Sequence, residues 1–312
     1  MKSHYLLIPV VLINYNNTHD TEECIESIYK SECVQPFVIV VDNASKDRDA
    51  VLSLKNKSHQ IHLIINEENV GFGRANNIGI KWALENIKSE YLLLLNNDTI
   101  IESTSIKHLV HSFTISSSIG VTTGKIMFNN NRNLVWYGGG DINIKRGWPK
   151  IIDFKAEATV EGANKSRYVT FASGCLMMFN RNCIEKIKGF DEDFFMYGED
   201  LEICLRLAKS NIKIYYNPEC VIYHKVQGSI KTEDKDVIGM NIKNPKLPFL
   251  FYHMKSNQWL AMMRNTNIIQ FAKFNLYFWS EFFLRTVIFA MRGRIEIISI
   301  ALKTIKRIAK YV

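Results

Sequence analysis

Four consecutive leucines, Leu92 to Leu95, end abruptly in two amides and a carboxylate, Asn96, Asn97 and Asp98. An apolar run of this kind predicts a strand buried on both faces, as in a parallel sheet that is covered by helices. Ligands bind such sheets beyond the carboxyl ends of their strands, so Asp98 is expected at a binding edge. A carboxylate there can hold Mg²⁺ or Mn²⁺ against a phosphate, although an ordinary Asn/Asp turn explains the same residues.

The rest of the first half alternates apolar runs with amphipathic stretches, which predicts repeated β-α units and a mostly parallel α/β sheet flanked by helices. Strands are expected over 6–13, 37–41, 61–65, 91–95 and 119–128, and helices over 20–31, 46–57, 74–89 and 103–115. Residues 129–167, rich in Asn, Gly and Lys, are expected to form a long excursion with short strands. Regular secondary structure is expected again at 168–179, and a helix is expected over 199–210.

Polar residues follow each of the first three predicted strands. They are Asn14, Tyr15 and Asn16, then Asp42 and Asn43, then Asn66. Because the carboxyl ends of parallel strands meet at one edge, these side chains are expected to form one polar cluster on one rim of the sheet. Asp42 is suited to bind a base or a ribose by hydrogen bonds, although Asp and Asn also favour turns.

A segment with two glycines, Asn69-Val70-Gly71-Phe72-Gly73-Arg74-Ala75-Asn76-Asn77, is superficially like a dinucleotide-binding fingerprint. It lacks the third glycine, where Asn76 stands, and its strand-helix unit is the third rather than the first. We expect the glycines to let the backbone approach a ligand, with Arg74 available to an anionic group.

Acidic residues are dense among aromatic residues between Gly189 and Asp200. A solvated loop is the usual fate of such a run. Glu199 and Asp200, however, begin the predicted helix, so one of them is held at a fixed place and is a candidate general base for an acceptor hydroxyl. Four residues of this helix are expected on one inward face: Leu201, Cys204, Leu205 and Ala208. His224 could join Asp98 as a metal ligand, but a single histidine is more often structural.

The formal net charge of +8 favours an anionic partner, which could be nucleic acid, a nucleotide substrate or an acidic membrane surface. Six cysteines without a Cys-x-x-Cys pair support neither a zinc ribbon nor a thioredoxin motif, and reduced thiols indicate a cytoplasmic location. Pro9, Asn14 and the lack of a small-residue cleavage site argue against a signal peptide. No stretch of about 18 residues is apolar and uncharged throughout, so a membrane-spanning helix is not expected.

Residues 266–312 mix large apolar residues with eight basic and two acidic ones, a net charge of +6. Basic amphipathic helices of this kind commonly lie in a membrane interface, with the apolar face down and the lysines toward anionic headgroups. The alternative is a helical pair packed on the protein's own core or on a partner. The positive charge lies among aliphatic residues rather than exposed aromatic ones, so a nucleic-acid partner is not expected.

Taken together, the segments resemble glycosyltransferase family 2, the inverting enzymes with a GT-A fold, and particularly its bacterial rhamnosyltransferase-like branch. The resemblance covers about 5–265. It rests on the order of the segments 14–16, 41–45, 69–77, 95–98, 172–174 and 189–200, on His224, and on Tyr252 followed by Arg264-Asn265. It implies a GT-A domain over 1–265, with a nucleotide-sugar-binding half at 1–128 and an acceptor half at 129–265, before a tail at 266–312.

The resemblance also implies roles for single residues. Asp98 matches the last acid of the family's DXD motif, in which Asn96 replaces the first acid, so that Mn²⁺ or Mg²⁺ would depend on His224 and on substrate phosphates. Asp200 aligns with the catalytic base, with Glu199 as the second candidate. The remaining matches fall in the donor pocket: Asn14, Tyr15, Asn16, Asp42, Asn43, Arg74, Asn77, Asn96 and Asn97.

The expected function is therefore transfer of a sugar from a nucleotide-sugar donor, dTDP-rhamnose or a UDP-hexose, to a glycan or lipid-linked acceptor at the inner face of the bacterial membrane. Two other classes stay open. A nucleotidyltransferase that makes the activated sugar also uses a β-α sheet, carboxylates and Mg²⁺, but it has a glycine-rich turn at its first strand, which 9–20 lacks. A membrane-bound assembly factor would bind glycan without turnover.

Overall fold

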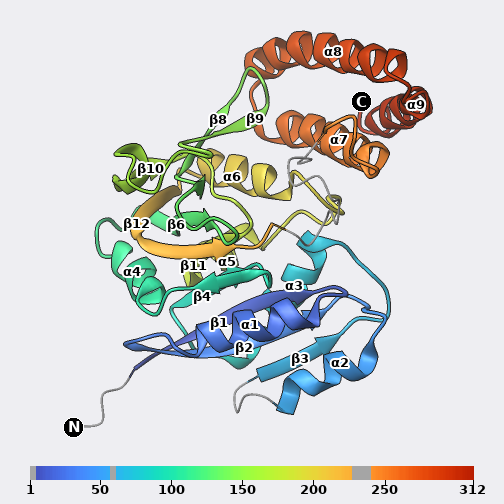
Figure 1. Cartoon of the computed structure of the whole chain (residues 1–312). Coiled ribbons are helices and arrows are strands. Elements are labelled where there is room, and N and C mark those ends of the chain that lie inside the picture. Colours follow the sequence, from blue (N-terminus) through green and yellow to red (C-terminus); the bar gives the residue numbers. More distant parts are fainter. Residues whose placement is uncertain (1–4, 57–60, 227–239) are drawn as a thin grey trace.

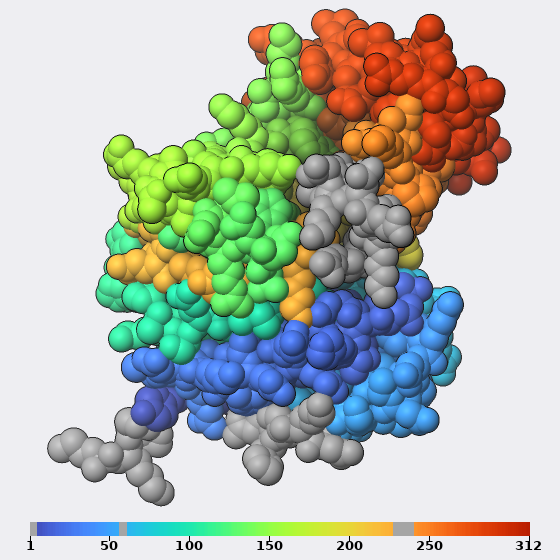
Figure 2. Space-filling model, viewed as in Figure 1, coloured from blue at the N-terminus to red at the C-terminus, as the bar shows by residue number. Residues whose placement is uncertain are grey.

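The computed structural model describes residues 5–56, 61–226 and 240–312. A large twisted sheet fills one end of the molecule, and three helices gather at the other end (Figure 1). These helices are α7 (Leu247–Asn265), α8 (Ile268–Met291) and α9 (Glu296–Ile308). Space-filling atoms show the same separation, with the orange and red helices beyond the blue strands of the first half (Figure 2).

The first half of the sheet is parallel. Its strands lie in the order β4 (Tyr91–Leu95), β1 (Leu6–Asn14), β2 (Val34–Asp42) and β3 (Ile61–Ile65). The apolar runs predicted these strands, because residues buried on both faces need no alternation of polar side chains. Leu92 to Leu95 are buried, as expected for a central strand. The carboxyl ends of these strands therefore lie at one edge.

The second half extends this sheet with mixed pairing. Beyond β4 come β11 (Leu176–Asn180), β6 (Ile119–Phe128), β12 (Lys213–His224) and β10 (Arg167–Val169). Two short strands complete the sheet, β5 (Thr99–Ile101) on β12 and β7 (Val135–Tyr137) on β6. The predicted excursion at 129–167 contains β7 and a separate hairpin of β8 (Gly140–Asn143) and β9 (Trp148–Ile151).

Helices cover the sheet and connect its strands. They are α1 (Thr18–Ile28), α2 (Arg48–Ser53) with the 3₁₀ turn η1 (Leu54–Asn56), α3 (Phe72–Asn86), α4 (Ser105–Ser112), η2 (Gly162–Asn164), α5 (Arg181–Ile187) and α6 (Glu199–Lys209). The predicted helix over 46–57 is shorter than expected and is split between α2 and η1, and residue 57 lies outside the described residues.

Helix α6 lies between two apolar cores. Ile203, Cys204 and Leu207 pack with the sheet, whereas Leu201 and Leu205 pack with α7, α8 and α9. Ala208, expected on the inward face, is exposed, whereas the preceding residue, Leu207, is buried. Contact on two sides holds the first turn of α6 at the junction between the sheet and the C-terminal helices.

The C-terminal helices are not an independent tail. Phe274, Phe278 and Phe282 of α8 are fully buried, in one cluster with Phe251 and Leu260 of α7. The division at 265/266 stays a prediction, but the apolar core continues across it. Among the helices of the described residues, none combines the length and the apolar character needed to cross a bilayer.

Candidate active site

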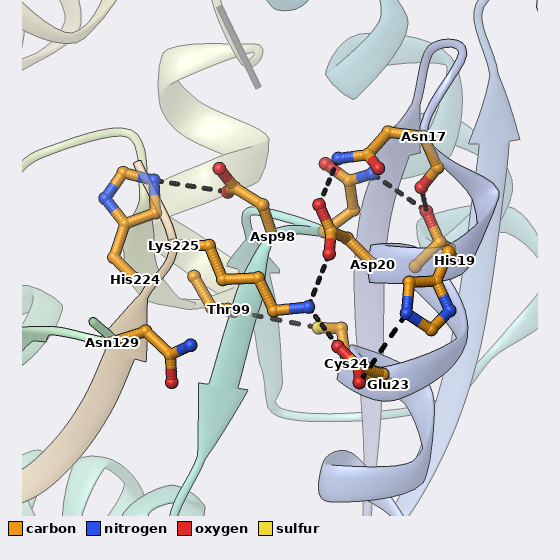
Figure 3. Close-up of polar contacts among 12 residues, drawn as sticks. Asn17, His19, Asp20, Glu23, Cys24, Asp98, Thr99, Asn129, His224 and Lys225 are labelled. Atoms are coloured by element: carbon orange, nitrogen blue, oxygen red, sulfur yellow. Dashed lines mark hydrogen bonds and ion pairs between the residues drawn. The ribbon is translucent and has the colours of Figure 1, made fainter. Parts of the chain in front are cut away.

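Asp98 and His224 lie side by side at the sheet edge. Asp98 follows β4, and His224 ends β12, where it pairs with Thr99 of β5. The backbone N–H of Lys225 donates to the Asp98 carbonyl at 2.9 Å, which fixes the two segments together. The His224 Nε2 atom is 3.2 Å from Asp98 Oδ1 (Figure 3). Two residues 126 positions apart in the chain thus form one buried pair.

The pKa values of the two groups shift in opposite directions. Burial alone would raise the pKa of Asp98, but His224 outweighs it and holds the pKa below its usual value. Burial alone would lower the pKa of His224, but the Cys175 thiol and the Asp98 carboxylate raise it well above its usual value. Each partner therefore favours the charged form of the other.

This pair fits a divalent cation. In octahedral coordination, two neighbouring ligand atoms each lie about 2.1 Å from the cation and make an angle of about 90° at it, so they are about 3 Å apart. The separation of His224 Nε2 and Asp98 Oδ1 is close to this value. Carboxylate oxygen and imidazole nitrogen are both ligands that Mn²⁺ accepts. Among the described residues no group of three or more His, Cys, Asp and Glu side chains forms a metal site. Such cations also commonly take oxygen ligands from substrate phosphates and water.

The rim beside this pair is a hydrogen-bonded network of buried polar groups. The Asn14 amide donates to Asp42 Oδ1 at 2.7 Å, and its carbonyl oxygen accepts from the Thr21 hydroxyl at 2.8 Å. The Asn97 amide donates to the same Thr21 hydroxyl at 2.8 Å. Asp42 also accepts from the backbone and side chain of Ser45. The predicted polar cluster therefore exists, and it joins the ends of β1, β2 and β4.

Tyr15 and Asn16 stand at the open side of this network. The Tyr15 side chain is 48% exposed, and no acidic or basic group pairs with it among the described residues. Asn16 adopts a φ of 55°, and its side-chain oxygen accepts from the Lys46 N–H at 2.8 Å. Asn96 contributes its backbone, with its N–H donating to the Cys175 carbonyl at 3.0 Å.

The glycine segment packs closely against another part of the chain. A Cβ on Gly71 would lie 2.2 Å from the Phe195 carbonyl oxygen, and one on Gly73 would lie 3.2 Å from Phe190 Cβ. Backbone N–H of Phe72 donates to the Phe195 carbonyl at 2.9 Å. The segment is therefore a support for the acidic loop 189–198.

Three residues predicted in the donor pocket hold loops in the structure. Asn77 donates to the Phe190 carbonyl and accepts from the Phe190 N–H, both at 2.8 Å. Asn43 accepts from the Val70 N–H at 3.0 Å. Arg74 Nε pairs with Glu192 at 3.0 Å, with both side chains about half exposed. The observed contacts of Asn77 differ most from a donor contact, because both ends of its amide are used.

Glu199 and Asp200 begin α6 with their carboxylates in different surroundings. Asp200 Oδ1 accepts from the Leu201 N–H at 2.8 Å, and the Gly174 backbone also hydrogen-bonds to this carboxylate. Glu199 Oε2 is buried without a hydrogen-bond partner among the described residues. Burial raises the pKa of both groups, and the Asp200 charge raises that of Glu199 further. Asp200 is therefore the member that ionises first.

The turn before Glu199 is held from α7. The Asn257 amide donates to the carbonyls of Met196 and Tyr197, at 3.0 and 2.6 Å. Tyr197 and Gly198 both have positive φ angles, 64° and 89°. A non-glycine residue in this region is strained, so the contact from Asn257 stabilises an unfavourable turn.

A short segment connects the two carboxylates. Residues 173–175 precede β11, which runs beside β4 with Leu176 opposite Leu95. Cys175 bonds to Asn96 through its carbonyl and affects the pKa of His224 through its thiol. A Cβ on Gly174 would lie 3.8 Å from Asp200 Cβ. Asp98 and Asp200 therefore flank one strip of backbone.

Sequence reasoning missed three features of the site. Cys175 carried no signal beyond its place after Ser173-Gly174, and Asn257 is one of three amide side chains in α7, with Gln258 and Asn265. Lys225 pairs with Asp20 and Glu23 of α1 (Figure 3). Charges at i and i+3 on a predicted helix could have indicated a shared partner, but not which one. Residues 227–239, which follow soon after His224 and Lys225, lie outside the described residues.

Comparison with known families gives a match over residues 7–237 to the family described as glycosyltransferase like family 2. Among curated proteins, a low-salt glycan biosynthesis hexosyltransferase, Agl10 of Haloferax volcanii, is 27% identical over 211 residues. The match covers 66% of this chain and 63% of the relative, so the chain spans less than two thirds of that relative's length.

A second relative, the dTDP-rhamnosyl transferase RfbF of Shigella flexneri, is 25% identical over 262 residues, covering 83% of this chain and 80% of the relative. Among solved structures, a mannosyltransferase of Pyrobaculum calidifontis in complex with GDP-mannose and Mn²⁺ superposes with a TM-score of 0.54. That match covers 99% of this chain and 76% of the other at 15% identity, so it bears on the fold alone. The predicted GT-A fold is confirmed by this likeness and by the sheet described above.

Proposed function

The chain belongs to glycosyltransferase family 2, in its rhamnosyltransferase-like part, and we propose that it transfers a sugar from a nucleoside-diphosphate sugar to an acceptor hydroxyl. The donor is dTDP-rhamnose or a UDP-hexose. The acceptor is a glycan or a lipid-linked glycan in the synthesis of a bacterial surface polysaccharide. Relatives named as a dTDP-rhamnosyl transferase and a hexosyltransferase support this choice of donors.

One observation carries this proposal. A buried acid and histidine pair, Asp98 and His224, and a second acid, Asp200, both neighbour the segment 173–175. Transfer of a sugar needs a positive counterpart for the leaving diphosphate and a base for the incoming hydroxyl, a sugar's width apart. We propose that Asp98 with His224 serves the leaving diphosphate and that Asp200 serves the incoming hydroxyl.

Asp200 is the proposed base. Its carboxylate is held by backbone N–H groups, so it does not need to reorient when it takes the proton of the acceptor hydroxyl. As that proton leaves, the hydroxyl oxygen attacks the anomeric carbon and the nucleoside diphosphate departs. Single displacement inverts the configuration at that carbon. Glu199, which keeps its proton more tightly, is the second candidate.

Asp98 and His224 are the proposed ligands of Mn²⁺ or Mg²⁺. When bound, the cation would offset the negative charge that builds on the leaving diphosphate. The chain's own contribution is to hold the two ligand atoms at a fitting separation in a buried position. The nucleoside is proposed to bind on the network of Asn14, Asp42 and Asn97, with Tyr15 over its open side.

The enzyme is proposed to lie in the cytoplasm, peripheral on the inner face of the membrane. Many apolar side chains of α8 are exposed although this helix buries four phenylalanines, and Leu276 is 77% and Met291 82% exposed. An apolar face of this size on a basic segment suits a membrane surface. Alternatively, that face packs on a protein partner.

A screen of nucleotide sugars tests the function. We expect one donor to be hydrolysed slowly, or to raise the melting temperature, in the presence of Mn²⁺ or Mg²⁺, and Asp98→Ala to remove the dependence on the cation together with turnover. Pyrophosphate release from a nucleoside triphosphate and a sugar phosphate would instead identify a nucleotidyltransferase. Binding of donor and glycan without product under any cation would identify an assembly factor. Cation-dependent turnover in Asp98→Ala would contradict the metal assignment.

A further inference from the structure

A cavity of about 460 Å³ lies between α7 and α9, outside the site described above. We name it the α7–α9 pocket. Its wall on α7 is Pro248, Phe249 and Tyr252. The opposite wall is Ile300, Lys303, Lys306 and Arg307 of α9, with Lys310 just after that helix. Small-molecule sites in proteins commonly have volumes of about 300–1,000 Å³.

The charge of the pocket selects an anion. Four of its lining side chains are basic, and none of the lining residues is acidic among the part of the chain that the structure describes. Within the same residues, no carboxylate forms a salt bridge with Lys303, Lys306 or Lys310. Several ammonium groups converging on one cavity suit a phosphate or a diphosphate.

The surface beside the pocket is apolar, which favours a lipid as the ligand. Ile295, Ile298 and Leu302 are exposed and recur at three- and four-residue spacing, so they form one row along α9. Lys303, Lys306 and Lys310 form the neighbouring row by the same spacing. An anion with a long apolar chain would contact both rows at once, whereas a free nucleotide would leave the apolar row uncovered.

The position of the pocket points to the acceptor rather than to bulk phospholipid. Arg307 donates to the Asp193 carbonyl at 2.8 Å and to the Ser256 hydroxyl at 2.8 Å. Tyr197 and Phe249 contact each other with ring centroids 6.4 Å apart. The pocket wall is thus joined to the acidic loop that leads directly into Glu199 and Asp200.

We propose that the α7–α9 pocket binds the phosphate end of the lipid that carries the acceptor sugar. The basic side chains hold the phosphate or diphosphate, and the apolar rows of α9 and α8 follow the lipid chain. The sugar end is then directed toward Asp200. The role of this lipid as carrier of the acceptor sugar rests on the proposed transfer reaction. The binding of a lipid phosphate in the pocket does not depend on that reaction.

Calorimetric titration with farnesyl diphosphate tests the pocket directly. A chelator is present, so that the cation-dependent donor site does not bind the probe. Lys303→Gln/Lys310→Gln should weaken binding by about tenfold or more. Lys273→Gln/Arg292→Gln, which removes the same charge from exposed positions of the same C-terminal segment, should change it by less than about twofold. Equal binding by the wild type and the pocket pair would overturn the proposal.

A second variant separates shape from charge. Ile300→Trp fills the cavity and keeps all four basic residues, so it should weaken farnesyl diphosphate to a similar degree. Asp98→Ala should leave this binding unchanged, since it alters only the donor side. Inorganic pyrophosphate and farnesol should each bind more weakly than farnesyl diphosphate. Pyrophosphate binding as tightly as the lipid would overturn the lipid assignment.

Vesicles distinguish the acceptor lipid from bulk phospholipid. The two double variants should bind phosphatidylglycerol vesicles equally, because both remove two charges from the surface. If the pocket pair alone lost these vesicles, the pocket would be a phospholipid site and the acceptor assignment would fail. Hydrolysis of the donor sugar is measured in parallel. Normal hydrolysis with no effect of the pocket pair on lipid would reject the pocket alone, whereas absent hydrolysis with intact lipid binding would reject the transfer reaction alone.

Discussion

Asp200 and Glu199 are neighbours in the chain, but Asp200 has the lower pKa of the two. Backbone N–H groups favour the charged form of Asp200, whereas Glu199 has a buried oxygen without a partner. Two adjacent buried carboxylates do not both ionise easily, so their protons leave in coupled steps. Such an arrangement provides one ionised base near neutral pH.

This pair predicts the pH dependence of turnover. Burial raises the pKa of Asp200 to about 6, so the base is protonated at a higher pH than an ordinary aspartate. The ratio kcat/KM should therefore fall about tenfold per unit as the pH drops below about 6, and level off above it. Glu199→Gln should keep this fall at nearly the same pH, because Glu199 still carries its proton when Asp200 ionises. A profile that stays flat down to pH 5 would rule out Asp200 as the base.

Asn257 gives a second prediction at the same scale. Asn257→Ala removes two hydrogen bonds from the strained turn at 196–198, which should lower the free energy of unfolding by about 1–3 kcal/mol. The value of kcat should fall more than the KM for the donor rises, because the turn positions Asp200. Asn265→Ala on the same helix is the control. Urea unfolding and steady-state kinetics measure both effects, and a change in KM alone would contradict the positioning role.

Residue identity alone predicted part of the site. Asp98 and His224 were expected as a pair, and the structure places them 3.2 Å apart, because both stand at strand ends of one sheet edge. The contact of Asn77 with Phe190 was not predicted, since an amide in a helix gives no indication of which loop it will face. Asn257 could not have been found, because its partners are main-chain carbonyls 60 residues away.

At the scale of elements, the glycine segment and the acidic loop act as one unit. Gly71 has a φ of 87°, and its α-carbon is so close to Phe195 that a Cβ would lie 2.2 Å from a carbonyl oxygen. Gly293 has a φ of 89° with nothing within 4 Å of such a Cβ. The two glycines therefore share a positive φ and differ in their surroundings.

Gly71→Ala should lower the free energy of unfolding by about 2–4 kcal/mol, from the positive φ and from displacement of the acidic loop. Gly293→Ala should cost only the conformational part, about 1 kcal/mol. The difference between the two, measured by urea unfolding, includes the contribution of the loop contact and that of the extended ψ of 170° at Gly71. Equal losses would show that Phe195 moves away without cost.

Elements of the sheet were predictable and their partners beyond it were less so. The apolar runs at 6–13 and 91–95 give strands at Leu6–Asn14 and Tyr91–Leu95, since a buried strand is distinct in composition. For α6, the period of apolar residues predicted one inward face, but the helix packs on two cores and exposes Ala208. Periodicity alone could not identify the second core.

At the scale of the whole molecule, α8 and α9 serve two surfaces. One face of α8 packs into the core through Phe274, Phe278 and Phe282, and the other exposes Leu276, Leu284 and Met291. The two predictions for residues 266–312, packing on the protein's own core and binding to a membrane surface, are therefore compatible. Deleting 268–312 would remove about half of the apolar core that α7, α8 and α9 form, so the rest of the protein would be destabilised. Substitution of exposed residues is therefore the better test of membrane binding.

Leu276→Ser/Leu284→Ser/Met291→Ser should reduce sedimentation with phosphatidylglycerol vesicles by about tenfold or more, since each large apolar side chain adds about 1–3 kcal/mol when buried. The melting temperature should change little, because these side chains are exposed. Leu52→Ser/Ile115→Ser/Tyr168→Ser, three exposed apolar residues of the sheet half, form the control. Unchanged sedimentation would indicate that the face packs on a protein.

The central claim is that Asp200 acts as base opposite Asp98 in one cleft, and turnover by Asp200→Asn tests it most directly. Asparagine keeps the size of the side chain and one acceptor oxygen, so the Leu201 contact can persist. We predict that transfer falls by about 10²–10⁴-fold while the dissociation constant of the donor sugar stays within about twofold. Transfer at the wild-type rate, with donor binding intact, would contradict the account.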